Sequence, residues 1–159
     1  MRNIWLQQGN EYRIGPDSMH VRDMLPVGVF HIAEDPRTDE LYLVYQSDSF
    51  TLPEKIYGME TDFIDHVIKT YKATERNLGV MLTGYQGTGK TLTGKILANK
   101  LHLPVIVVDH PYRKLTDFLN AIPHECIIFF DEFEKVYNKE ETTTLLSCID
   151  GAKTNDVQK

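Results

Sequence analysis

Apolar residues recur with two different periods along this chain, and the period changes near residue 52. Before that point, the runs 27–33 and 41–46 are rich in β-branched and aromatic residues, and the polar segment 34–40 separates them. This pattern predicts a β-hairpin with a long loop. Because two strands alone are marginal in water, we expect the hairpin to pack on the following domain, on a third strand near residues 12–14, or on a partner.

After a joint at residues 52–58, strand and helix patterns alternate. Helical spacing of apolar residues occurs in three stretches: 61–71, 92–101 and 115–122. Three apolar runs are β-capable: 80–83, 104–108 and 126–130. The last two are apolar on both faces, as in a sheet covered by helices on both sides. We therefore predict a β-rich segment over residues 1–52 and an α/β domain with a mostly parallel sheet over residues 53–159.

Composition narrows the class of protein. The 159 residues suffice for one domain with a buried core, and no apolar run approaches the roughly 20 residues of a membrane helix. The N-terminus lacks the apolar core of a signal peptide. Cys126 and Cys148 have no metal-ligand spacing, so we predict reduced thiols in a cytoplasmic protein, and His20 and His31 receive no role. The net charge of -6 argues against a chain that wraps nucleic acid as a whole.

The strongest chemical signal is the segment 84–91, between the apolar run 80–83 and the helical pattern 92–101. It fits the phosphate-binding loop G-x-x-x-x-G-K-S/T at every fixed position. Glycines let the backbone wrap around a phosphate chain, and the N–H groups of the following helix point at it. We predict that Lys90 lies along the β- and γ-phosphates and that the Thr91 hydroxyl binds Mg²⁺. The predicted nucleotide-binding residues of this stretch are Gly84, Tyr85, Gln86, Gly87, Thr88, Gly89, Lys90, Thr91 and Leu92.

A second chemical signal lies about 40 residues later, where the apolar run 126–130 ends in Asp131 and Glu132. An apolar strand that ends in Asp-Glu is the Walker B pattern. Phosphoryl transfer needs a held metal ion and an oriented nucleophile more than covalent help from the protein. We predict that Asp131 holds Mg²⁺ together with Thr91, and that Glu132 orients and deprotonates the attacking water. Lys90 and Glu132 are thus the predicted catalytic residues.

Taken together, these motifs resemble the AAA+ family of ATPases. Two weaker features add to the resemblance. Ile56-Tyr57-Gly58 looks like the family's segment that touches adenine, and residues 145–151 are similar to its Leu-Leu-x-x-Leu-Asp-Gly stretch. The resemblance runs from about Ile56 to the end of the chain. It implies the three-layer parallel sheet of P-loop NTPases, binding and hydrolysis of Mg-ATP, and a ring of identical chains that remodels a protein or nucleic-acid partner.

The sequence departs from the family pattern in two places. The family continues after residue 151 with a sensor strand, a further strand, an arginine finger and a helical lid, so we expect either a fragment or an incomplete module. Where the family has its substrate-gripping loop, residues 109–114 offer Tyr112 but no glycine. We expect Tyr112 to be a packed or surface residue rather than a gripping one.

Two alternatives to the ATPase stay open, and two other classes of nucleotide-binding protein are disfavoured. One alternative is a binding or switch module that holds ATP with little turnover, and another is a loader ATPase that acts on DNA. A GTPase is disfavoured, because Glu132-Phe133-Glu134 follows Asp131 and residues 138–141 lack the aspartate of a guanine reader. A small-molecule kinase would need a substrate lid and basic phosphate grips, which the sequence does not offer.

Overall fold

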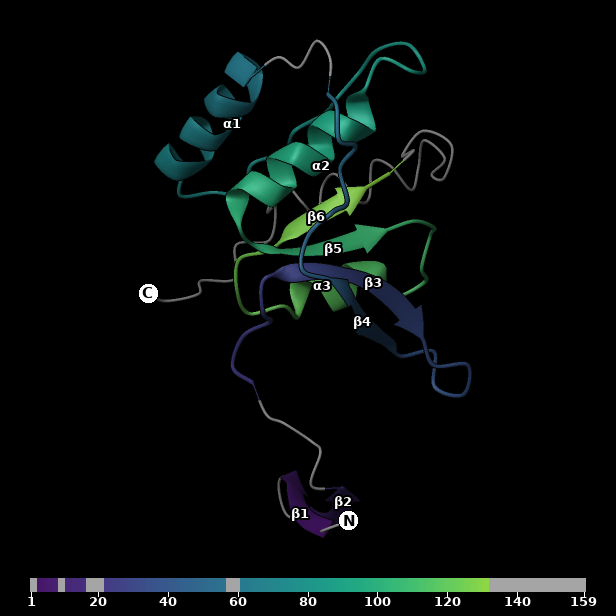
Figure 1. Ribbon diagram of the computed structural model, residues 1–159. Coiled ribbons are helices and arrows are strands. Elements are labelled where there is room, and N and C mark those ends of the chain that lie inside the picture. Colours follow the sequence, from purple (N-terminus) through teal and green to yellow (C-terminus); the bar gives the residue numbers. More distant parts are fainter. Residues whose placement is uncertain (1–2, 9–10, 17–21, 57–60, 132–159) are drawn as a thin grey trace.

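The computed structural model describes residues 3–8, 11–16, 22–56 and 61–131. The first two of these ranges are strands β1 (Asn3–Gln8) and β2 (Glu11–Pro16), which form an antiparallel two-stranded sheet. The third strand expected near residues 12–14 is therefore part of β2, and it pairs with β1. In Figure 1 this hairpin lies apart from the rest of the described chain.

Among the described residues, the main sheet has four strands in the order β4-β3-β5-β6. They are β3 (Gly28–Glu34), β4 (Leu41–Ser47), β5 (Pro104–Val108) and β6 (Ile127–Phe130). Strands β3 and β4 form the predicted hairpin, while β3 pairs with β5 and β5 with β6 in parallel. The hairpin thus packs on the following domain by joining its sheet. The boundary near residue 52 stays a prediction, and the sheet extends across it.

Helices lie on both faces of this sheet, which confirms the predicted α/β fold of the P-loop NTPase class. Figure 1 shows α2 (Lys90–Leu101) on one face and α3 (Leu115–Asn120) on the other. On the α3 face, the buried residues of the core are Ile32, Ile106, Val108, Tyr112 and Leu115. Helix α1 (Thr61–Ala73) packs against α2 through the buried residues Ile64, Val67, Ile96 and Leu97. No described helix has both the length and the apolar run needed to cross a membrane.

The partly buried Cys126 packs against the α3 face of the core. It is a free thiol, as expected of a reduced core cysteine, and burial raises its pKa. Cys148 lies outside the described residues.

The prediction of a strand over residues 80–83 is wrong for this structure. The segment forms no strand, and Val80 and Met81 are 41% and 68% exposed. A strand requires ladder hydrogen bonds to a neighbour, and none of the described strands pairs with this segment. Leu82 nevertheless lies close to Gly94 of α2, where a Cβ atom would be 3.6 Å from Leu82 Cδ1. The segment therefore runs beside the core without joining the sheet.

Candidate nucleotide-binding site

The loop 84–89 owes its shape to glycines with positive φ. These are Gly84 at 144°, Gly87 at 83° and Gly89 at 83°. At Gly87 and Gly89 a Cβ atom would meet nothing within 4 Å, so the backbone conformation and not crowding favours glycine there. Gly89 directly precedes α2, and no side chain caps the start of that helix. The N–H groups in the first turn of α2 can therefore bind an anion.

Lys90 folds back over the loop. Its Nζ donates hydrogen bonds to the carbonyl oxygens of Gly84 at 2.7 Å and Tyr85 at 2.8 Å. The Thr88 hydroxyl donates to the same Tyr85 oxygen at 2.8 Å. The loop is thus closed by its own side chains around an ammonium group. Phosphate oxygens would compete with these two carbonyls for the ammonium, as the predicted role of Lys90 requires.

Thr91 and Asp131 bring the two sequence motifs together. The Thr91 hydroxyl, in the first turn of α2, donates a 3.0 Å hydrogen bond to Oδ1 of Asp131, which follows β6. Hydroxyl and carboxylate oxygens are ligands that Mg²⁺ accepts in proteins. The pair therefore fits a magnesium ion beside the phosphate loop, and the Mg²⁺ site itself stays a prediction.

The remaining predicted residues have different positions. Tyr85 is 89% exposed on the loop, and Gln86 is exposed beside it. Leu92 and Ile56 are partly buried, and both pack against the apolar cluster between α1 and α2. The shared cluster places the segment that precedes α1 next to the helix that follows the loop. Glu132, Tyr57 and Gly58 lie outside the described residues.

Asp109 lies at the same edge of the sheet as Asp131, and the sequence alone predicts no role for it. Residues Val108 and Phe130 are register partners, so Asp109 and Asp131 follow neighbouring parallel strands at the same edge of the sheet. Oδ1 of Asp109 lies 2.7 Å from His110 Nδ1, and it accepts a 3.1 Å hydrogen bond from the Tyr112 hydroxyl. The sequence signal that could have identified Asp109 is its position directly after an apolar strand, which is also the position of Asp131.

The environment of Asp109 favours the ionised carboxylate. Burial raises the pKa of Asp109, but the hydrogen bonds from Tyr112 and His110 and the charge of His110 outweigh burial and hold the pKa below its usual value. His31 of β3 also lies nearby, with its Nδ1 3.9 Å from Oδ2. The carboxylate thus joins the end of β5 to strand β3.

Tyr112 is a packed residue, as expected. It is 8% exposed, and its ring lies against His110 at 3.9 Å between centroids. Its one hydroxyl proton is shared between the Ile32 carbonyl oxygen at 2.9 Å and Oδ1 of Asp109 at 3.1 Å. A side chain held in this way by β3 is unsuited to gripping a substrate.

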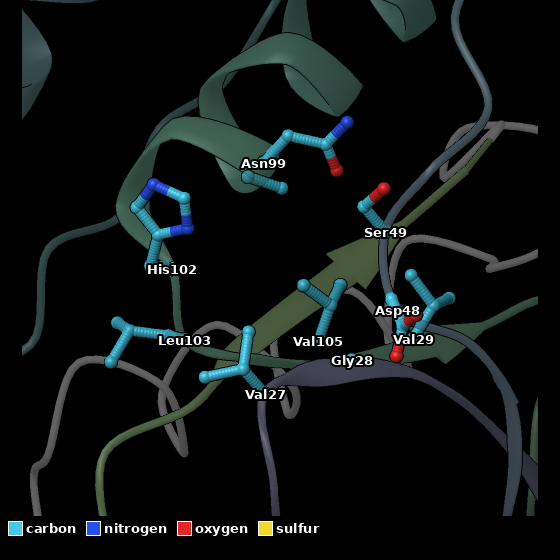
Figure 2. Close-up of a pocket in the computed structure, with 10 residues that line it drawn as sticks. Val27, Gly28, Val29, Asp48, Ser49, Asn99, His102, Leu103 and Val105 are labelled. Carbon is cyan, nitrogen blue, oxygen red and sulfur yellow. The ribbon is translucent and has the colours of Figure 1, made fainter.

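A separate cavity of about 220 Å³ lies at the opposite end of α2 from the loop. Figure 2 shows Asn99 and His102 of the helix end on one side, and on the other Val105 of β5 and Val27, which directly precedes β3. Its distance from the loop along the helix separates it from the candidate nucleotide site.

Residues 80–158 match the family described as "ATPase family associated with various cellular activities (AAA)". An AAA domain-containing protein, ycf46, of Trieres chinensis is 25% identical over 114 aligned residues, and the match covers 64% of this chain and 20% of that protein. The ycf46 protein of Guillardia theta is 33% identical over 72 residues, 37% of this chain and 14% of that protein. A Dictyostelium discoideum protein named as a ribosome biogenesis ATPase, nvl, is 30% identical over 105 residues, 52% of this chain and 12% of that protein.

The chain therefore spans a fifth or less of the length of these curated relatives. No solved structure matches it.

Proposed function

Because this chain belongs to the AAA family of ATPases through residues 80–158, we propose that it binds Mg-ATP at the loop 84–91 and hydrolyses it. The observation that carries the proposal is the hydrogen bond between Thr91 and Asp131. It joins the phosphate loop to the acidic end of a neighbouring strand, which is the arrangement that metal-assisted phosphoryl transfer requires.

In this proposal each residue has a distinct task. The Lys90 ammonium neutralises charge on the β- and γ-phosphates, and the N–H groups at the start of α2 bind phosphate oxygens. Thr91 and Asp131 would hold Mg²⁺, which supplies neutralisation of the charge that develops on the phosphates. Glu132, the residue after Asp131, orients and deprotonates the attacking water. The segment Ile56-Tyr57-Gly58 contacts adenine.

The proposed setting is a ring of identical chains that remodels a protein or a nucleic acid. The support is family membership, and one relative is named as a ribosome biogenesis ATPase. Since the chain matches only a small part of each relative, the partner is proposed by class alone.

The test is ATP turnover of the chain and of its Glu132→Gln variant over a wide range of protein concentration. We expect turnover per chain to rise with concentration, because neighbouring subunits complete the sites of a ring, and to vanish in the variant while ATP binding persists. Normal turnover in Glu132→Gln would contradict the role given to Glu132. Tight binding without turnover at any concentration would favour the switch module. A salt-dependent affinity for DNA would favour the loader.

A further inference from the structure

Strand β4 is an unprotected edge of the main sheet. Among the described strands it is hydrogen-bonded to β3 alone, so its other side offers unpaired ladder groups. Tyr42, Val44 and Tyr45 are 51%, 47% and 49% exposed. Edge strands are usually protected by charged residues, by proline or by short length. Leu41–Ser47 is seven residues long and contains neither a charge nor a proline, so a further strand could pair with it.

The β1–β2 hairpin is the part of the described chain that needs a neighbour. It is a sheet of two six-residue strands, and such a unit is marginal in water without further packing. Its two outer edges are not equivalent. Strand β2 carries Glu11 and Arg13 and ends in Pro16, which has no N–H to donate. Strand β1, Asn3–Gln8, contains no charge and no proline, so it is the better pairing edge.

Charge favours β1 over a second β4 as the partner of β4. Acidic residues flank β4 on both sides: Asp39 and Glu40 precede it, and Asp48 follows it. Two β4 strands side by side in antiparallel register would bring these acidic flanks together, which is unfavourable. Arg2 directly precedes β1 in the sequence. The sequence that flanks β1 thus carries a positive charge, and the sequence that flanks β4 carries negative charges on both sides.

The path of the chain favours a partner strand from another molecule. The Leu25 amide donates a 3.1 Å hydrogen bond to Nε2 of His124, which lies shortly before β6. Among the described strands, β6 lies at the opposite end of the sheet order from β4, so the segment that leads from the hairpin into β3 is attached at the far side. Figure 1 accordingly shows the hairpin away from β4 of its own chain.

We propose that β1 of one copy of this chain pairs with β4 of a second copy and extends its sheet. The contact joins two different surfaces, so it is heterologous, and repetition of the contact gives a ring or an open chain of copies. It needs no nucleotide, and it is independent of the proposed ATPase activity.

The test is amide hydrogen exchange of the peptide that covers Leu41–Ser47, measured without nucleotide at several concentrations of the full chain. About half of the amides of an edge strand point away from its one neighbour and exchange freely unless a further strand covers them. By mass action, we expect these amides to exchange at least about tenfold more slowly at roughly 100 μM than at roughly 1 μM protein. We expect Leu6→Pro, which removes a donor from β1, to abolish this change.

The control is Leu6→Val, which keeps the N–H and a β-capable side chain and should exchange like the unaltered chain. Peptides from β5 should keep their protection in both variants if the main sheet is intact. Exchange of β4 that is independent of concentration, whether slow or fast, overturns the proposal, because slow exchange would mean that a strand of the same chain covers β4. Concentration-dependent protection that persists in Leu6→Pro also overturns it, since the partner would then be another surface.

Discussion

Thr91 and Asp131 are 40 positions apart in the sequence, and the hydroxyl of the first donates a 3.0 Å hydrogen bond to the carboxylate of the second. The bond joins the first turn of α2 to the end of β6. Thr91 is exposed and Asp131 is partly exposed, so a metal ion can reach their oxygens from solvent. Two motifs that the sequence offers independently therefore form one site.

Asp131→Asn tests the metal role of this pair. The amide keeps the shape of the side chain but removes the negative charge that Mg²⁺ needs. We expect the gain in ATP affinity on adding Mg²⁺ to fall by about tenfold or more, the equivalent of roughly 1.4 kcal/mol. Titration calorimetry with and without Mg²⁺ measures this gain. Asp62→Asn, at the start of α1, is the matched control and should leave the gain unchanged.

Lys90→Ala should abolish measurable ATP binding. Lys90 holds the only side-chain ammonium hydrogen-bonded to loop carbonyls among the described residues, and charged hydrogen bonds are each worth roughly 1.5–3 kcal/mol. The control is Lys100→Ala in the last turn of the same helix, where Nζ pairs with Asp65 at 3.4 Å. Equal losses of ATP affinity in the two variants would show a general effect of helix charge and no specific role for Lys90.

The parts of the fold that depend on interactions between residues close in sequence could be predicted, and those that depend on distant residues could not. The helices and the strands β3 to β6 depend on local periodicity, and they formed where the pattern predicted them. Pairing of β3 with β5 depends on residues far apart in sequence, so the pattern left open what the hairpin would pack on. The failed strand at residues 80–83 has the same cause, because apolar β-capable residues make no ladder without a partner strand.

The candidate site shows the same division. The phosphate-loop pattern of Gly84–Thr91 and the apolar run before Asp131 are local signals, and the structure brings Thr91 and Asp131 into hydrogen-bond contact. The hydrogen bonds of Asp109 could not be predicted from motif spacing. Its hydrogen bonds depend on how the loop after β5 turns and on the position of Tyr112 against β3.

Gly94→Val should destabilise the protein through the contact between α2 and the sheet. A Cβ atom on Gly94 would lie 3.0 Å from Cε2 of Phe129, closer than normal packing allows. Overpacking of this kind costs about 1–3 kcal/mol, so we expect a lower free energy of unfolding in denaturant titrations. Gly79→Val is the control, because a Cβ atom there meets nothing within 4 Å. A Gly94 variant as stable as the control would mean that Phe129 moves aside without cost.

Asp109 should make the stability of the protein depend on pH in a definite direction. The folded protein holds the pKa of this carboxyl below its ordinary value of 3.8, so its stabilising effect is present above about pH 4 and is lost as the pH falls through the folded pKa. We therefore expect Asp109→Asn to lower the melting temperature at pH 6 to 7, with a smaller difference in strongly acidic solution.

Tyr112→Phe provides the check on cause. It removes the hydroxyl that donates to Asp109, so carboxyl NMR titration should show the pKa of Asp109 higher in this variant than in the unaltered protein. An unchanged pKa would leave His110 as the main partner of the carboxylate.

Asn99 fixes the segment after β4 to the last turns of α2. The Phe50 amide donates to Asn99 Oδ1, and Asn99 Nδ2 donates to the Phe50 carbonyl oxygen, both at 2.9 Å. Asn99→Ala leaves two partly buried backbone groups without these bonds, and we expect a loss of about 1–3 kcal/mol in the free energy of unfolding.

Asn99→Asp keeps an acceptor for the amide but directs a carboxylate oxygen at the carbonyl, so it should also lose stability at neutral pH. That loss should become smaller in acid, where the protonated carboxyl can donate in place of Nδ2. Asn120→Ala, at the exposed end of α3, is the control. If Asn99→Ala were as stable as this control, the Phe50 contact would contribute nothing to holding the segment after β4, and packing alone would have to fix it against α2.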